Sequence, residues 1–571
     1  MTARTNTKKT ALSPHERAVI TAASTGDVAD FSDLDTPPAL QAEMLRRLIT
    51  GLAQNRRKYA DPVAPRGIRI KHAVIEGMLD LSGWTGRADD PSRILPTIEL
   101  ENCTLNAPVS LEESHIDSLS FLGCSLVRLS AGSARIVGSV HLNGSTITGA
   151  EANQAGENLA LDFAGAKIGG NVILRPRSGQ RFHASSEISF LGACIEGAFN
   201  ANGALLDNPG GVALNFTRVD IRNSVFLTVE AGFRFQANGE CRFWIADIGG
   251  QFAANGADLN NPGNEALSFQ GANIRGNVFL LASSGGLPFR AVGDVHFTGA
   301  RIESNLITQD VEIDGTFGVR NAHVQALFDN PDTGWPRQNG HIQLSGFTYN
   351  RLHQDNAKHE DNPIGRRLDW IKRQYQDPNR PKASEFDPQP YTQYANILRA
   401  RGQNGDADQV LITMHALRLQ THMDPWFMQA FQKFLGLTCR FGYSSSRAVL
   451  ALMIWILIGS AFYGAHAFSG SFGPAEQIGH GEHASLSGTK VSIPGVFTKT
   501  VRGCPGLIAP LYAMDTVLPI VEFGQRRACA FDPTGRFGAP LWRAFDFFYA
   551  LIGAILFAIT VVTLTGLLRE D

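Results

Sequence analysis

The middle of the chain repeats one pattern of apolar and polar positions at nearly even intervals. Each copy reads F-x-x-A-x-I-x-x-x-x-x-L or a close variant, so a Phe, a small residue and branched apolar residues recur together. The copies begin at Phe163, Phe190, Phe216, Phe243, Phe269 and Phe297. Their spacings of 26 to 28 residues indicate a repeat architecture, in which each copy forms one supersecondary unit.

A longer period of 53 residues overlies the first. Residues 201–216 read ANGALLDNPGGVALNF and residues 254–269 read ANGADLNNPGNEALSF, so alternate repeats resemble each other most. Nearer the N-terminus, residues 98–117 and 119–138 show a shorter period near 20, and the segment from Gly67 looks like the first repeat. Short apolar runs separated by Asn, Asp and Gly are typical of short strands joined by tight corners.

Repeats of 20 to 27 residues that each turn one apolar row inward predict a parallel β-solenoid over residues 61–350. We therefore expect a mainly β fold, followed by an α-helical hairpin region and two transmembrane helices. Within residues 1–60, the stretch 37–52 is expected to form a helix that caps the open N-terminal edge of the solenoid. The alternative is that this stretch binds a partner.

Two uncharged apolar stretches near the C-terminus predict membrane spans at residues 448–468 and 547–568. About 20 apolar residues cross a hydrocarbon core of roughly 30 Å, and the alternative is a pair of buried globular helices. The basic residues Lys433, Arg440 and Arg447 precede the first span. They predict that both chain ends are cytoplasmic, although seven Lys and Arg residues in the intervening loop oppose this orientation.

The loop of residues 469–546 contains two features that bear on function. Cys504 and Cys529 are the only two cysteines of this loop, where an oxidising compartment would permit a disulfide. The apolar segment 507–523 is interrupted by two prolines and Asp515, so it is too broken to span. It is either an interfacial cap or a re-entrant segment, in which case Asp515 or Glu522 would sit at the mouth of a pore.

Residues 351–447 change to helical spacing. A helix-turn-helix is predicted from residues 390–400 and 407–420, with Asp387 and Asp406 as N-caps. Because a lone hairpin cannot bury its faces unaided, we expect it to pack on the last repeat or on a partner subunit. The segment MDPWFMQAFQKFLGL that follows predicts an amphipathic interfacial helix anchored by Trp426, Phe427, Phe431 and Phe434.

The search for chemistry identifies no catalytic, cofactor-binding or metal-binding residues. The chain contains no G-x-G-x-x-G, G-x-x-x-x-G-K-[ST], H-E-x-x-H, G-x-S-x-G or C-x-x-C motif. Two weak groups remain, which are predicted to be solvated loop residues: His480, Glu482 and His483, and His353, His359 and Glu360. The cysteines of the repeats are predicted to be reduced core residues: Cys103, Cys124, Cys194 and Cys241.

Charge argues against nucleic acid as a partner. The whole chain carries a formal net charge of -2. Residues 61–350 contain 20 basic and 29 acidic residues, a net charge too dilute to imitate a duplex with about one charge per 1.7 Å. The low charged fraction of 18%, against roughly 25% in ordinary soluble domains, agrees with the predicted spans.

The five-residue stepping of the apolar positions resembles the pentapeptide-repeat β-helix. The signature A-x-I-x-G-N-V-x-L at residues 272–280 is similar to that of bacterial membrane-anchored proteins with a degenerate pentapeptide-like solenoid. The segments that begin at Phe386 and Leu511 resemble the same group. The resemblance implies the bacterial inner membrane. The label "membrane-associated oxidoreductase" used in this group implies a chemistry for which the chain shows no motif.

These observations predict a non-enzymatic scaffold, anchored in the lipid bilayer, whose cytoplasmic β-solenoid binds an unidentified protein partner. An oligomeric ion channel or transporter subunit with a re-entrant segment 507–523 is the alternative, and it requires a homo-oligomer because two helices leave no room for a pore. An oxidoreductase is the third possibility. The predicted organisation is 1–60 N-terminal cap or tail, 61–350 solenoid, 351–447 helical linker, 448–468 first span, 469–546 extracytoplasmic loop and 547–568 second span.

Overall fold

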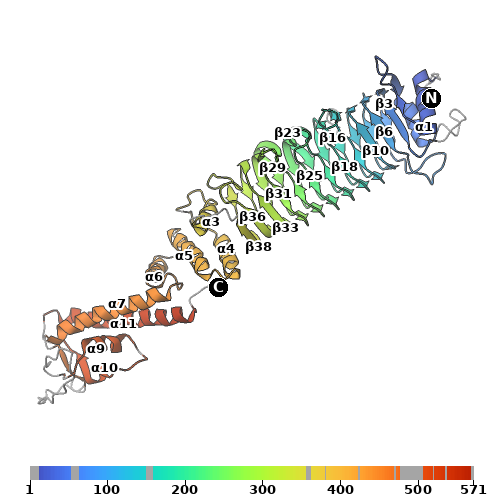
Figure 1. Cartoon of the computed structure of the whole chain (residues 1–571). Coiled ribbons are helices and arrows are strands. Elements are labelled where there is room, and N and C mark those ends of the chain that lie inside the picture. Colours follow the sequence, from blue (N-terminus) through green and yellow to red (C-terminus); the bar gives the residue numbers. More distant parts are fainter. Residues whose placement is uncertain are drawn as a thin grey trace, which may run out of the picture. The chain divides into compact units, whose positions relative to one another are not determined.

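The computed structural model describes residues 12–52, 63–149, 158–354, 362–379, 381–421, 425–468, 471–475, 504, 506–518, 520–533 and 537–567. The chain divides into two compact units, Met1–Gln403 (unit 1) and Asn404–Asp571 (unit 2). Unit 1 consists mostly of parallel β-sheet, and unit 2 contains two long apolar helices (Figure 1). The predicted combination of a mainly parallel β region and two apolar C-terminal helices is confirmed.

The strands of unit 1 belong to two large sheets. The 20-stranded sheet contains β1 (Ala29–Asp30), β3 (Ile68–Lys71), β6 (Ile98–Glu101), β9 (His115–Ile116), β10 (Leu119–Leu122), β13 (Arg135–Ile136), β14 (Val140–His141), β17 (Lys167–Ile168), β18 (Val172–Ile173), β21 (Cys194–Ile195), β22 (Phe199–Asn200), β24 (Asp220–Ile221), β25 (Val225–Phe226), β27 (Asp247–Ile248), β28 (Phe252–Ala253), β30 (Asn273–Ile274), β31 (Val278–Leu280), β33 (Arg301–Thr308), β36 (His323–Asp329) and β38 (Thr348–Gln354).

The 18-stranded sheet contains β2 (Ala39–Gln41), β4 (Val74–Glu76), β5 (Leu79–Asp80), β7 (Thr104–Leu105), β8 (Val109–Ser110), β11 (Ser125–Leu126), β12 (Leu129–Ser130), β15 (Thr146–Ile147), β16 (Leu159–Asp162), β19 (His183–Ala184), β20 (Glu187–Ser189), β23 (Leu205–Asn215), β26 (Gln236–Arg242), β29 (Asp258–Ser268), β32 (Phe289–His296), β34 (Val311–Asp314), β35 (Phe317–Gly318) and β37 (Ile342–Gln343).

Each repeat lays its strands parallel to those of the repeat before. The Ile of the motif shows the register, because equivalent isoleucines are direct partners along the ladder β17, β21, β24, β27 and β30. These residues are Ile168, Ile195, Ile221, Ile248 and Ile274, each at most 1% exposed. Successive side chains of a strand point to opposite faces, so the motif buries one residue and leaves its neighbour outside.

The Phe of the motif forms a continuous column inside unit 1. Neighbouring rings along the column have centroids 4.7 to 5.3 Å apart, in stacked or edge-to-face arrangements. The column consists of Phe163, Phe190, Phe216, Phe243, Phe269 and Phe297, all fully buried. Buried aromatic pairs at this distance stabilise the core beyond the area they bury, which explains the strict recurrence of Phe.

Two arginines explain the 53-residue period. Arg181 and Arg234 occupy equivalent places in alternate repeats, and each guanidinium donates hydrogen bonds to three backbone carbonyl groups of the following repeats. The acceptors are Gly203, Ala204 and Arg234 for the first arginine, and Gly256, Ala257 and Pro288 for the second. Carbonyl groups left unpaired at a buried corner are costly, so the arginines stabilise the loops of alternate repeats.

The N-terminal end of the stack is closed by helices and short strands. Helix α1 (Pro14–Thr25) begins at a capping box formed by Ser13 and Glu16, and α2 (Ala42–Thr50) buries its apolar face. Strand β1 pairs with β3 and strand β2 pairs with β4. The prediction of one continuous helical cap over residues 37–52 is therefore wrong in part, because residues 39–41 extend the sheet and the helix starts only at Ala42.

Helices α3 (Pro363–Lys372) and α4 (Gln389–Ala400) close the other end of unit 1. The side-chain amide of Gln389 donates to the Phe347 carbonyl at 2.9 Å, and that of Gln393 donates to the Tyr349 carbonyl at 2.6 Å. Of the hairpin expected to pack on the last repeat or on a partner subunit, the first helix, α4, thus packs on the last repeat. The prediction of Asp387 as N-cap is wrong, because the N-cap of α4 is Pro388; the Asp387 carboxylate, one residue earlier, accepts from the Gln389 amide at 2.9 Å.

Unit 2 comprises α5 (Asn404–Gln420), α6 (Trp426–Cys439), α7 (Ser445–Phe468), α9 (Ala509–Val517), α10 (Gln525–Ala528), α11 (Ala539–Thr565) and the antiparallel pair β39 (Phe472–Pro474) and β40 (Cys529–Phe531). Helix α5 begins at Asn404, so the prediction of Asp406 as N-cap is wrong and Asp406 lies in the first turn. The GQNGD turn is shorter than predicted because its second half is already helical.

The two long apolar helices have mean hydropathies of 2.1 and 2.4, and both are long enough to cross a membrane. Helix α7 begins three residues before the predicted first span. Helix α11 begins eight residues before the predicted second span and ends at Thr565. The earlier start of α11 adds Arg543 and Asp546 to the helix, and each of them has a polar partner elsewhere in the unit. Arg543 donates to Asp532 at 2.8 Å and Asp546 accepts from Tyr463 at 2.6 Å.

Candidate functional site

One outward-facing row of side chains on unit 1 is apolar at every position except Asn200. Along the ladder β18, β22, β25, β28, β31, β33 and β36, the outward residue of each strand is a direct partner of the next. This outer apolar row consists of Ile173, Asn200, Phe226, Ala253, Phe279, Ile307 and Phe328. Except for the buried Ala253, the members of the row are half-buried. Their neighbours on the same strands, such as Val278 beside Phe279, are fully buried.

The same ladder carries charge where it continues toward the N-terminus. Lys71 pairs with Glu101 at 3.0 Å and Arg69 pairs with Glu99 at 3.2 Å. At the other end, the His353 ring stacks on Phe328 with centroids 4.5 Å apart. The apolar character is therefore confined to the middle and later repeats. An apolar row of this kind on a flat sheet face suits contact with another protein rather than catalysis.

A charged cluster lies on the other sheet of unit 1. Arg242 donates two hydrogen bonds to Glu240, at 2.9 and 2.7 Å, and its guanidinium lies 4.2 Å from the Trp244 ring centroid. Glu265 lies 3.1 Å from His296, and the hydrogen bond from His296 holds the pKa of the Glu265 carboxyl below its usual value. Among the described residues, no group of three or more His, Cys, Asp or Glu side chains could hold a metal ion.

Unit 1 also contains two open clefts near its C-terminal end. One, of about 540 Å³, is lined among others by Arg290, Glu312, Asp314 and Arg337. The other, of about 270 Å³, is lined by residues of α3 and its surroundings. Both mix acidic and basic side chains, and neither contains a nucleophile next to a base, so their geometry indicates no reaction class.

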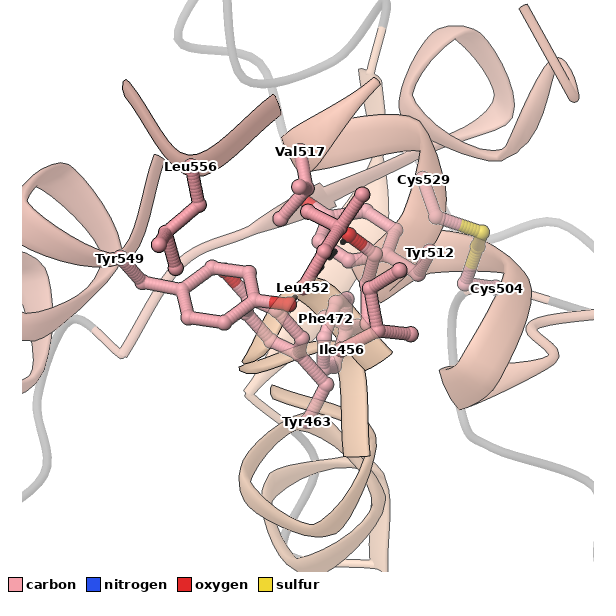
Figure 2. Packing of buried hydrophobic residues seen from close by; sticks show 11 residues of the cluster. Leu452, Ile456, Tyr463, Phe472, Cys504, Tyr512, Val517, Cys529, Tyr549 and Leu556 are labelled. Atoms are coloured by element: carbon pink, nitrogen blue, oxygen red, sulfur yellow. Dashed lines mark hydrogen bonds between the residues drawn. A yellow bond between two sulfur atoms is a disulfide. The ribbon is translucent and has the colours of Figure 1, made fainter. Parts of the chain in front are cut away.

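In unit 2, the short helix α9 packs against both long helices. Tyr512, Ala513 and Val517 of α9 are buried among side chains of α7 and α11 (Figure 2). The Tyr512 ring centroid lies 4.8 Å from that of Tyr463 on α7, and the Tyr549 hydroxyl of α11 donates to the Ala513 carbonyl at 3.4 Å. Apolar residues 507–523, which the sequence left open between an interfacial cap and a re-entrant segment, therefore begin as a helix inserted beside both long helices.

Two glycines allow this close packing. A Cβ atom at Gly553 would lie 2.6 Å from the Val517 side chain, and a Cβ atom at Gly459 would lie 2.2 Å from the Tyr549 ring. Gly553 follows the first residue of the 27-residue helix α11 by 14 residues, which is about 21 Å at 1.5 Å per residue. The C-terminal end of α9 therefore lies level with the middle of α11.

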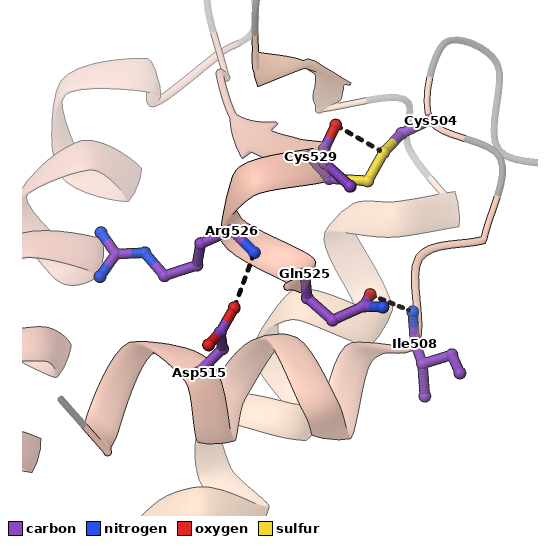
Figure 3. The surroundings of a disulfide bond; sticks show 7 residues. Cys504, Ile508, Asp515, Gln525, Arg526 and Cys529 are labelled. Atoms are coloured by element: carbon purple, nitrogen blue, oxygen red, sulfur yellow. Dashed lines mark hydrogen bonds between the residues drawn. A yellow bond between two sulfur atoms is a disulfide. The ribbon is translucent and has the colours of Figure 1, made fainter. Parts of the chain in front are cut away.

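The structure places the two predicted pore residues in different roles, and Figure 3 shows that of Asp515. Asp515 accepts backbone hydrogen bonds from Phe523 at 3.0 Å and from Arg526 at 2.8 Å, so its carboxylate holds the chain that returns from α9. Glu522 pairs with Arg527 at 2.6 Å, and the two side chains are 63% and 78% exposed. Glu522 is thus the candidate whose charge faces outward, whereas Asp515 is engaged within the unit.

The cysteines separate by unit. Cys504 and Cys529 form a disulfide beside α10, with Cα atoms 5.9 Å apart (Figure 3). The cysteines of the repeats are free: Cys103, Cys124 and Cys241 are buried, and Cys194 is half-buried. The predicted loop residues His480, Glu482 and His483 lie outside the described residues, as do His359 and Glu360.

Sequence reasoning missed one polar pair inside the helical unit. The hydroxyl of the fully buried Tyr463 on α7 donates to Asp546 on α11 at 2.6 Å. Asp546 was excluded from the second span because a charged residue ends an apolar run in the sequence. The signal that could have found the pair is the aromatic sequence around Asp546, since a carboxylate among aromatic residues needs a hydroxyl donor.

Comparison with known proteins finds no matching family model, no matching curated protein and no matching solved structure.

Proposed function

We propose that this protein is a membrane-anchored, non-enzymatic scaffold, and that the parallel sheets of unit 1 form a pentapeptide-like β-solenoid that binds a cytoplasmic protein. Helices α7 and α11 cross the bacterial inner membrane, with both chain ends in the cytoplasm. The disulfide between Cys504 and Cys529 supports this orientation, because disulfides persist in oxidising compartments outside the cytoplasm. The expected resemblance to membrane-anchored pentapeptide-like proteins supports the same location.

The outer apolar row carries the proposal. Its aromatic members Phe226, Phe279 and Phe328 stand in register on a regular sheet face. Solenoid surfaces bind partners along such extended faces. A protein partner with its own apolar face would bury these rings.

A photo-crosslinking amino acid placed at Phe279 tests the docking face in cells that express the full chain. The matched control is the same amino acid at Asp247, an outward residue of a different ladder whose side chain is 41% exposed. We expect a discrete adduct with another protein at position 279, lost on substitution Phe226→Ser, and no adduct at position 247. Equal adducts at both positions, or none at 279, would refute the docking face.

A second candidate function is an oligomeric channel subunit, and the depth of α9 favours it. The helix enters from the loop side and ends level with the middle of α11, as expected of a re-entrant segment that lines a pore. Planar-bilayer current with the variant Glu522→Gln tests this candidate, with Glu385→Gln in unit 1 as control. A conductance whose ion selectivity changes only with Glu522→Gln supports a pore. A silent bilayer with verified insertion contradicts it.

A further inference from the structure

The chain that follows α9 returns toward the loop side without forming a helix. Residues 520–524, here termed the return limb, lead from α9 to α10. The Gln525 side chain accepts a hydrogen bond from the Ile508 amide, just before the start of α9, at 3.0 Å (Figure 3). The return limb therefore starts at the depth of the end of α9 and finishes level with its beginning.

The return limb is open on its outer side. Ile520 is 77% exposed, Val521 is 45% exposed and Phe523 is 37% exposed. The side chain of Glu522 is 63% exposed and that of its partner Arg527 is 78% exposed. Apolar and charged side chains thus share one surface, which neither water nor lipid alone would solvate well.

No described residue covers this surface, and such exposure is unfavourable for a single copy in a bilayer, given the membrane anchoring proposed above. Non-helical backbone within the hydrocarbon region is found only where protein buries it or where it lines a water-filled cavity. The Glu522 carboxylate, which lies between the levels of the two ends of α9, also requires a polar environment. We infer that the return limb is covered by second copies of this chain, so that the limbs of several subunits meet around a common axis.

The charges near the return limb favour a second copy of the same chain as the protein that covers it. Glu522 is followed within five residues by the cations Arg526 and Arg527. In a ring of identical subunits, the same acidic and basic patches repeat from one copy to the next. Glu522 can therefore exchange its partner within the chain, Arg527 at 2.6 Å, for Arg527 of a neighbouring copy. A surface that carries both signs in this order is self-complementary. The apolar residue Ile520 then packs between subunits.

Oligomeric state in lipid nanodiscs, measured on the full chain by native mass spectrometry, tests the inference. We expect one oligomer of defined size for the unaltered chain. Glu522→Arg and Arg527→Glu, each expressed alone, should reduce the oligomer at least fivefold because like charges then face each other. Co-expression of the two variant chains should restore mixed oligomers, because each supplies the charge that the other lacks. If Glu522 and Arg527 pair only within one chain, co-expression of the two variant chains should not restore the oligomer.

A cysteine at the limb gives an independent measurement. Glu522→Cys should form an oxidative crosslink between subunits, whereas Leu564→Cys, which is 62% exposed near the far end of α11, should not. A single copy per nanodisc, or equal crosslinking at both positions, overturns the inference. If the membrane pellet retains that single-copy chain after carbonate washing, the anchoring stands and only the assembly fails. If carbonate releases the chain, the proposed anchoring and the inference fail together.

Discussion

Replacing Arg367 should detach the helical end of unit 1 from the last repeats. The guanidinium donates two hydrogen bonds to Asp329, at 2.8 and 2.7 Å, and both side chains have no exposed surface. Trp335 donates a third hydrogen bond to the same carboxylate at 2.6 Å. The guanidinium also lies 4.7 Å from the Trp370 ring centroid. Arg367 thus joins α3 to the last repeats through one buried, fully paired carboxylate.

The variant Arg367→Met preserves most of the volume and removes the charge. The Asp329 carboxylate then remains buried with one neutral donor, and breaking a buried pair in this way costs about 3 to 5 kcal/mol. One factor of ten corresponds to about 1.4 kcal/mol, so exchange of the α3 amide hydrogens should accelerate by roughly two to four orders of magnitude. Hydrogen exchange measured by mass spectrometry on the full chain reports this directly.

The neighbouring residue provides the control. Arg366 pairs with Asp332 at the surface, with side chains 30% and 57% exposed, and such pairs contribute only about 0 to 1 kcal/mol. Arg366→Met should therefore change exchange by less than about tenfold. The double variant Asp329→Leu with Arg367→Met should recover much of the loss, because no unpaired charge remains. Equal effects of the two single arginine variants would refute the reasoning.

Three further predictions concern the corners, the disulfide and the charged cluster. Ile245 has a φ of 55° and is 59% exposed, so Ile245→Asn should raise the free energy of unfolding by about 1 kcal/mol, since a branched residue is strained there by roughly 1–2 kcal/mol; an unchanged chemical denaturation midpoint would contradict this. Cys529→Ser removes a crosslink between residues 25 positions apart and should destabilise the loop by about 2–4 kcal/mol, seen as faster proteolysis of residues 504–533. If the serine has no other effect, the variant should be cleaved at the same rate as the chemically reduced chain. The Glu265 pKa is lowered by the hydrogen bond from His296, so its contribution to stability is complete above pH 4.5 and is lost as pH falls through the lowered value; Glu265→Gln should flatten the pH dependence of unfolding in that acidic range, and an unchanged slope would count against the pair.

The repeats and the long helices are visible in the amino-acid sequence alone. A repeat that stacks on its own copy must place the same residue type at the same buried position each time, so the pattern that begins at Phe163 is visible without coordinates. The apolar stretch of α7 is likewise local, because about 20 uncharged residues in a row have few other stable environments. Both signals are strong because the physical requirement acts on every repeat or on every residue of the helix.

The partners of the polar residues follow from the three-dimensional arrangement. Asp515 and Glu522 look equivalent in the sequence, yet one binds the backbone of the returning chain and the other faces outward. The outer apolar row was equally hidden, because outward Phe279 and inward Val278 are adjacent in one apolar triplet. The Tyr463–Asp546 contact joins residues 83 positions apart. Such pairings depend on how distant elements meet, and local sequence patterns do not encode that geometry.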